Sequence, residues 1–107
     1  MAISKKWSSY IKVSIKNLSP ELIGVYEIAH RENNTILYIG EGKIRDRLLA
    51  HFPDGKRPEE IVVGANVFRF EITVNKIEAI RLQNYHLADF KLKNNGKTPK
   101  YNKRSFN

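Results

Sequence analysis

The residues with the clearest chemical potential are two tyrosines, an arginine and a histidine between positions 26 and 51. Tyr26 and Tyr38 lie in segments rich in β-branched and aromatic residues, and Arg47 and His51 are four residues apart in the stretch that follows. On a helix this spacing puts both side chains on one side, one turn apart. A guanidinium offers a rigid fork of donors that matches a phosphate, and a histidine can exchange a proton near pH 7. A neutral phenol is a poor base at that pH, so a tyrosine in such a site needs a metal ion or a nearby cation to lower its pKa.

Each of these side chains also has an ordinary structural explanation. Tyrosines at strand positions are common core or edge residues, and a single arginine on a helix is often only solvated. His51 fits a surface position as well as it fits a site. Their chemistry therefore depends on the elements that would bring them together.

The hydrophobic pattern first predicts a β-hairpin. Residues 24–30 and 35–40 are separated by Glu32-Asn33-Asn34, which is a turn signal. Gly40-Glu41-Gly42 is expected to break the second strand. Residues 8–16, ahead of the hairpin, fit either a strand or a helix.

Beyond the hairpin the pattern predicts a short helix over residues 44–52, a third strand over 67–74 and a long helix over 76–93. We therefore expect an α+β fold with a small three-stranded antiparallel sheet flanked by helices. On a helical wheel the long helix places Gln83 in the middle of one apolar arc, which is expected to face the sheet. The other members of that arc are Ile77, Ile80, Leu87 and Phe90.

Length and composition exclude several classes of protein. The 107 residues suffice for one domain, which we expect to span residues 1–107. The absence of cysteine excludes disulfides, thiolate metal sites and a cysteine nucleophile. No apolar run approaches the length of a signal peptide core or a membrane span, so we expect a cytoplasmic protein without a membrane partner, associated with the nucleoid if it is prokaryotic.

The basic charge is concentrated at the two ends of the chain. The formal net charge is +8 at pH 7, and residues 1–20 and 90–107 contain ten basic residues and no acidic ones. The middle of the chain, with all eleven acidic residues, carries −2. Segregated lysines interleaved with aromatic residues suit a nucleic-acid backbone, although two solvated ends would have the same composition.

Four signals in order resemble a known family. Gly24-Val25-Tyr26 and Tyr38-Ile39-Gly40 are eleven residues apart, the helix after them contains Arg47 with His51-Phe52, and Pro99-Lys100-Tyr101-Asn102 lies near the end. Together they resemble the GIY-YIG nuclease superfamily, in particular excision-repair incision nucleases and phage intron homing endonucleases. The resemblance covers residues 15–102.

The resemblance implies a role for each matching residue. Tyr26 and Tyr38 would face one pocket, where Tyr38 positions or deprotonates the attacking water. Arg47 would hold the scissile phosphate, and His51 would protonate the leaving group or bind a neighbouring phosphate. Asn102 would tie the end of the chain back to the site.

Gln83 departs from the family pattern. It aligns with the catalytic glutamate, which is the family's one protein ligand for Mg²⁺ or Mn²⁺. A neutral amide removes the only formal negative charge that the protein would offer the metal. Glu41, directly after Tyr38-Ile39-Gly40, is the candidate carboxylate to replace it. A naturally inactive DNA-binding relative, an enzyme that uses Glu41 or the amide, and a deliberately introduced Glu→Gln change all fit the sequence.

The implied function is a metal-dependent endonuclease domain that hydrolyses a DNA phosphodiester, with structured or branched DNA among its candidate partners. The alternative is a catalytically inactive nucleic-acid-binding module of the same fold. A small basic RNA-binding protein is a third, more distant possibility. The residues expected to contact DNA are Lys43, Arg45, Lys91, Lys93, Lys97, Lys100 and Asn102.

Overall fold

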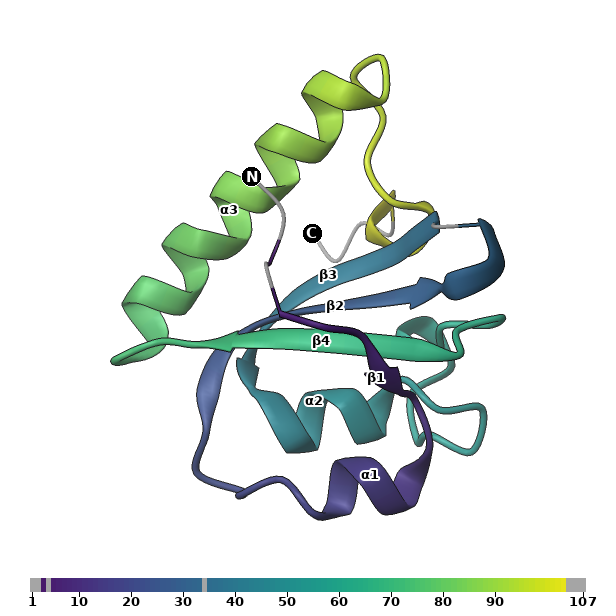
Figure 1. The fold of residues 1–107 in the computed structure, drawn as a ribbon, viewed down its shortest axis with the longest axis vertical. Helices are drawn as coiled ribbons and strands as arrows, with labels where there is room; N and C mark the ends of the chain where they lie inside the picture. The colour runs from purple at the N-terminus through teal and green to yellow at the C-terminus, as the bar shows by residue number, and fades with distance from the viewer. Residues whose placement is uncertain (1–2, 4, 34, 104–107) are drawn as a thin grey trace.

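A four-stranded antiparallel sheet, with strand order β1-β4-β2-β3, forms the centre of the protein. The computed structural model describes residues 3, 5–33 and 35–103 (Figure 1). β2 (Ile23–His30) and β3 (Thr35–Lys43) form the hairpin, and β4 (Val67–Ile72) pairs with the other side of β2. β1 (Ser8–Ser9) extends the sheet beyond β4.

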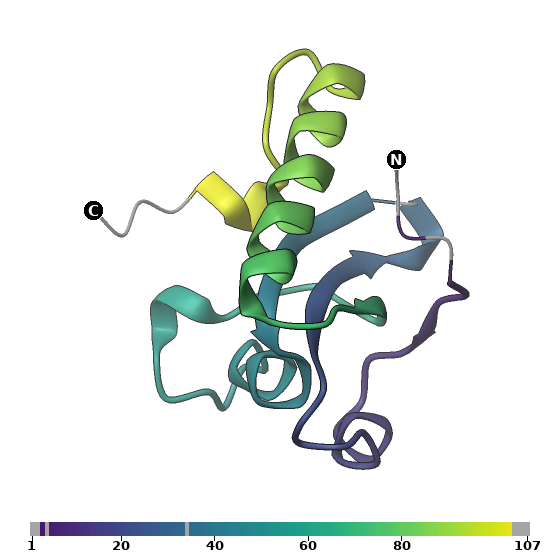
Figure 2. The same cartoon turned by 90° about the vertical axis from the view of Figure 1, so that its left-hand side faces the viewer.

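Helices cover both faces of this sheet. α1 (Lys12–Lys16) and α2 (Ile44–Ala50) lie on one face, and α3 (Lys76–Lys93) crosses the other (Figures 1 and 2). Successive strand residues point to opposite faces, so each strand supplies two separate cores. Tyr26 and its neighbours pack toward α2, while Ile39 packs toward α3.

The expected α+β architecture is confirmed, with one more strand than expected. The stretch over residues 8–16 contains both elements that its pattern allowed, because β1 pairs with β4 and α1 follows directly. The short helix ends at Ala50, and the long helix has the expected bounds. Within the described ranges no helix is long and apolar enough to cross a membrane.

The second strand of the hairpin is longer than expected. Gly40 and Gly42 do not end β3, because Tyr26 pairs with Gly40 and Gly24 pairs with Gly42. Gly42 has a φ of 123°, which glycine adopts without the steric cost that a side chain would add. The strand therefore continues to Lys43 and leads straight into α2.

The buried face of α3 also differs from the expected arc. Ile77 and Ile80 are exposed, whereas Ala79 and His86 are buried against the sheet. The side of α3 that carries Ala79 and His86 therefore faces the sheet, and the two isoleucines lie on sides that face solvent. Gln83, Leu87 and Phe90 keep the expected orientation toward the sheet, as their contacts with β3 and its core show.

Gly40→Ala is expected to destabilise the fold by about 3 kcal/mol, the upper end of the cost of overpacking. A Cβ at this position would overlap the phenol of the fully buried Tyr26 and lie 2.7 Å from Cε2 of Tyr38. Urea unfolding measures the loss. Gly64→Ala is the control, because its Cβ would have nothing within 4 Å and only backbone strain of about 1–2 kcal/mol is expected. Equal losses for the two variants would contradict the tight packing at Gly40.

Candidate functional site

Two successive hydrogen bonds, from Tyr26 through His51 to Glu60, connect the sheet to the loop that follows α2. The Tyr26 side chain is 0 % exposed, and its hydroxyl lies 2.7 Å from Nε2 of His51, which is 1 % exposed. Nδ1 of His51 lies 2.5 Å from the Glu60 carbonyl oxygen. A carbonyl oxygen only accepts, so Nδ1 carries the hydrogen and, in the neutral imidazole, Nε2 accepts from the Tyr26 hydroxyl. His51 therefore has both ring nitrogens engaged inside the protein.

Burial raises the pKa of Tyr26 well above its usual value, and the neighbouring Tyr38 raises it further. Arg47 opposes part of this rise through its charge and a hydrogen bond to the phenol. Tyr26 is consequently a neutral donor at physiological pH. Tyr26 and His51 are positioning residues, because neither side chain reaches solvent.

Tyr38 is the member of the aromatic cluster that solvent can reach. Its ring is half-buried, with its centroid 4.6 Å from that of His51 and 6.1 Å from that of Tyr26. The structure thus brings together the two tyrosines and the histidine that the sequence singled out. Of the three, Tyr38 is the side chain that a ligand can touch.

Arg47 lies one turn before His51 on α2 and forms an ion pair with the Glu60 carboxylate. Glu60 belongs to the short 3₁₀ turn η2 (Pro58–Glu60), and its other carboxylate oxygen lies 3.6 Å from Nε of Arg57. The hydrogen bond from Arg47 holds the pKa of Glu60 below its usual value. Arg47, which the resemblance implied would bind the scissile phosphate, is therefore paired with the Glu60 carboxylate in this structure.

No pattern in the sequence pointed to Glu60. It lies in the irregular stretch between α2 and β4, where neither hydrophobic periodicity nor a motif fixes the position of a side chain. Its backbone carbonyl accepts a hydrogen bond from His51, and its carboxylate forms an ion pair with Arg47. This one residue therefore connects the loop to both side chains of the site.

Gln83 and Asn102 lie at the outer edge of β3. The Asn102 side chain accepts from the Ile39 backbone N–H at 2.9 Å and donates to the Ile39 carbonyl at 2.9 Å. Nε2 of Gln83 donates to the same carbonyl at 3.2 Å. Ile39 directly follows Tyr38, so both amides adjoin the strand that carries the half-buried tyrosine. Gln83 reaches this edge from α3, which covers the face of the sheet opposite α2 and Arg47 (Figure 1).

Glu41 is the carboxylate near this edge with an oxygen that lacks a hydrogen-bond partner. Its Oε1 is buried without a hydrogen-bond partner, and Nζ of Lys76 lies 3.9 Å away. The next residue, Gly42, packs against the aliphatic stem of Arg47, because a Cβ there would lie 3.4 Å from its Cγ. Within the described part of the chain, no group of three or more His, Asp or Glu side chains is arranged to hold a metal. One carboxylate with waters and phosphate oxygens is nevertheless a donor set that Mg²⁺ accepts.

The basic residues expected to contact DNA fall into two groups. Lys43 and Arg45 flank the start of α2, close to Arg47 in the chain. Lys91 and Lys93 lie at the far end of α3 and Lys97 lies in the turn after it, at the opposite end of the molecule from α2 (Figures 1 and 2). Lys100 begins the short 3₁₀ turn η3 (Lys100–Lys103), which packs against β3. This second group comprises Lys91, Lys93, Lys97 and Lys100.

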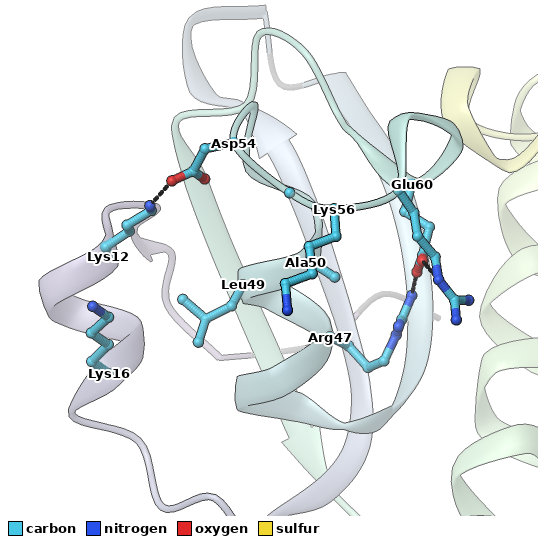
Figure 3. A pocket seen from close by; sticks show the side chains of 10 residues that line it. Lys12, Lys16, Arg47, Leu49, Ala50, Asp54, Lys56 and Glu60 are labelled. Atoms are coloured by element: carbon cyan, nitrogen blue, oxygen red, sulfur yellow. Dashed lines mark hydrogen bonds and ion pairs between the residues drawn. The ribbon is translucent and has the colours of Figure 1, made fainter.

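A basic cleft of about 530 Å³ opens beside Arg47 (Figure 3). Lys12 and Lys16 line it from α1, and Lys56 and Arg57 line it from the loop after α2. The sequence marked Lys12 and Lys16 only as part of a basic end and did not single out Lys56 or Arg57. The two lysines of α1 are four positions apart, which places them on one side of a helix, and this spacing is the signal that could have indicated the cleft.

Comparison with protein families gives one match. Residues 1–89 match the family model described as Domain of unknown function (DUF7508). The chain belongs to this family. Among the curated proteins none matches the chain. The DUF7508 match spans the aromatic cluster, Arg47, Glu60 and the basic cleft, and it ends before the lysines at the end of α3.

Tyr26→Phe is expected to destabilise the protein by about 1–3 kcal/mol, because it leaves the buried Nε2 of His51 without a donor. Thermal or urea unfolding measures the change. Tyr85→Phe is the matched control, since Tyr85 is half-exposed on α3 and its hydroxyl is expected to contribute less than about 0.5 kcal/mol. Indistinguishable effects of the two variants would show that the Tyr26–His51 hydrogen bond does not stabilise the fold.

Glu60→Gln is expected to cost about 1–2 kcal/mol at pH 7 and much less in acid. The pKa of Glu60 is lowered by Arg47 in the folded protein, so the pair stabilises the fold above the unfolded value of about 4.3. This contribution is lost as the pH falls through the lower folded pKa. Unfolding free energies from pH 7 to pH 3 test it, with the exposed Glu59→Gln as control. A pH-independent difference between wild type and Glu60→Gln would refute the ion pair's role.

Proposed function

We propose that this chain is a nuclease-type domain that binds DNA and hydrolyses a phosphodiester with the help of Mg²⁺ or Mn²⁺. The observation that carries the proposal is that Arg47 lines the basic cleft and also hydrogen-bonds the buried Tyr26, which forms one cluster with Tyr38 and His51. A guanidinium that connects a basic cleft to a cluster containing a half-buried phenol suits a phosphate and an attacking water. The order of motifs that resembles GIY-YIG nucleases supports the same chemistry.

Arg47 would bind the non-bridging oxygens of the scissile phosphate. In the free protein it is paired with Glu60, so an entering phosphate takes the place of one carboxylate oxygen. The guanidinium then stabilises the charge that builds on the phosphate as the water attacks. Glu60 keeps Arg57 as a second partner and remains compensated while Arg47 turns to the substrate.

Tyr38 would orient the attacking water, since it is the cluster's solvent-reachable phenol. The water oxygen bonds to phosphorus and gives up a proton to solvent, the bond to the leaving sugar oxygen breaks, and that oxygen takes up a proton from solvent. His51 takes no direct part in these proton transfers, because both of its ring nitrogens are bonded inside the protein. It holds Tyr26 and Glu60 in place around the reacting groups.

Glu41 is the residue that would hold a divalent ion, through the buried carboxylate oxygen that lacks a hydrogen-bond partner. When bound, the ion would polarise a phosphate oxygen and lower the pKa of the attacking water. Lys76 lies 3.9 Å from this oxygen and lessens its negative potential, so an ion would have to compete with the lysine.

A binding module of the same fold is the second candidate. The observation that favours it is the role of Gln83, whose amide donates to the Ile39 carbonyl. A carboxylate could not make this hydrogen bond, so the amide suits the edge of β3 as a structural group. Such a module would grip DNA through Arg47 and the cleft and leave it intact.

Nicking of supercoiled plasmid in Mg²⁺ or Mn²⁺ tests the proposal. We expect slow nicking by the protein, complete loss in Arg47→Ala, and an increase of orders of magnitude in Gln83→Glu. A carboxylate restored to a preorganised site can contribute several kcal/mol to the transition state, and each ~1.4 kcal/mol is tenfold in rate. Gln83→Glu should still fold, because Asn102 continues to satisfy the Ile39 carbonyl.

Arg81→Ala is the matched control, since Arg81 is an exposed arginine on α3 paired with Glu78. Brisk cutting by the unaltered protein that is lost in Glu41→Gln would assign the metal to Glu41. If Gln83→Glu binds DNA and metal and still fails to cut, the binding module replaces the enzyme.

A further inference from the structure

We infer that the basic cleft between α1, α2 and the loop over residues 51–62 holds the phosphate backbone of duplex DNA next to the scissile phosphate. This inference rests on the proposed function and names the surface that the substrate occupies. It differs from the expectation drawn from the sequence, in which lysines near the C-terminal end carry much of the binding.

The charge of the cleft favours a polyanion. Five basic and two acidic side chains line it, which leaves three positive charges in excess. Lys12 pairs with Asp54, and Glu60 is shared by Arg47 and Arg57, so both acids hold basic groups in position around the opening. Lys12 and Lys16 face the cleft at one end, and Arg47 lies at the other, with Lys56 between them (Figure 3). A backbone that follows these cations arrives at Arg47.

The lining also indicates which part of a nucleic acid would lie there. Its uncharged members are Leu49, Ala50 and Gly55, and none of the lining residues is aromatic. Surfaces that bind single strands use aromatic rings on which successive bases stack. A cleft with cations and small apolar groups but no ring suits sugar and phosphate, and therefore the outside of a duplex.

The walls of the cleft are fixed to one another and to the aromatic cluster. The Tyr10 hydroxyl donates to the Leu48 carbonyl at 2.6 Å, and the Tyr10 ring stacks on Phe52 with centroids 4.3 Å apart. These contacts hold the segment that leads into α1 against α2. The loop is closed where the Val62 N–H donates to the His51 carbonyl at 3.0 Å. His51 thus anchors both the loop of the cleft and the buried Tyr26, so the cleft and the cluster form one rigid unit.

Two matched quadruple variants test the inference. The first changes Lys12, Lys16, Lys56 and Arg57 to Gln, and the second changes Lys91, Lys93, Lys97 and Lys100 to Gln. Both remove four positive charges, and all eight side chains are exposed, so both should fold, which circular dichroism and the melting temperature check. The measurement is the affinity for a short duplex as a function of salt concentration.

We expect the first variant to flatten the log–log salt dependence by about 0.9 for each lost phosphate contact, up to about 3.6 in total. The second variant should keep a slope close to that of the unaltered protein. An unchanged slope in the first variant, with duplex binding intact in the unaltered protein, would overturn the cleft and leave the proposed function standing. Absence of any duplex binding by the unaltered protein would instead overturn the proposed function.

The same titration with a single-stranded oligonucleotide and with duplex RNA separates the possible ligands. We expect weaker binding of the single strand than of duplex DNA, and a smaller difference between the two quadruple variants on it. Tighter binding of the single strand, with the loss confined to the cleft variant, would overturn the assignment to a duplex.

Discussion

The arrangement of the site depends on one buried imidazole with a partner at each ring nitrogen. His51 accepts from the Tyr26 hydroxyl in the sheet and donates to the Glu60 carbonyl in the loop. A buried imidazole nitrogen without a hydrogen-bond partner lowers the free energy of unfolding, so the fold favours the one ring orientation in which both hydrogen bonds form. Through this ring the position of Tyr26 in the strand fixes the position of Glu60 in the loop. The Glu60 carboxylate is thereby placed where it forms an ion pair with Arg47.

Electrostatic compensation then shapes what the site can bind. An anion at Arg47 replaces Glu60 and does not add to it, so the net gain from that contact alone is small. The other cations of the cleft supply the remaining attraction for a polymer that carries many phosphates. Under the proposed function this division favours a nucleic-acid backbone over a single phosphate, because only the backbone would reach Arg47 and the lysines of α1 together.

The sequence specified local elements well and long-range placement poorly. The hairpin, α2 and α3 were predictable because their residues follow a strand or helix period. The grouping of Tyr26, Tyr38 and His51 was expected from the resemblance to GIY-YIG nucleases, since the periodicity alone left His51 equally suited to the surface. Glu60 and the cleft were not predictable, since they depend on a loop without periodicity. The exposed isoleucines of α3 show a different failure, because the helix buries Ala79 and His86 and leaves the more hydrophobic Ile77 and Ile80 in solvent.

The two edge strands of the sheet, β1 and β3, affect the tendency of the protein to self-associate in concentrated solution. An outer strand with free backbone groups invites another molecule to pair with it. At β3 the Asn102 amide occupies the Ile39 N–H and carbonyl as a neighbouring strand would, with Gln83 on the same carbonyl. At the opposite edge β1 has only two residues, too few to recruit a partner strand. The segment after α3 therefore hinders the pairing of β3 with a strand of another molecule.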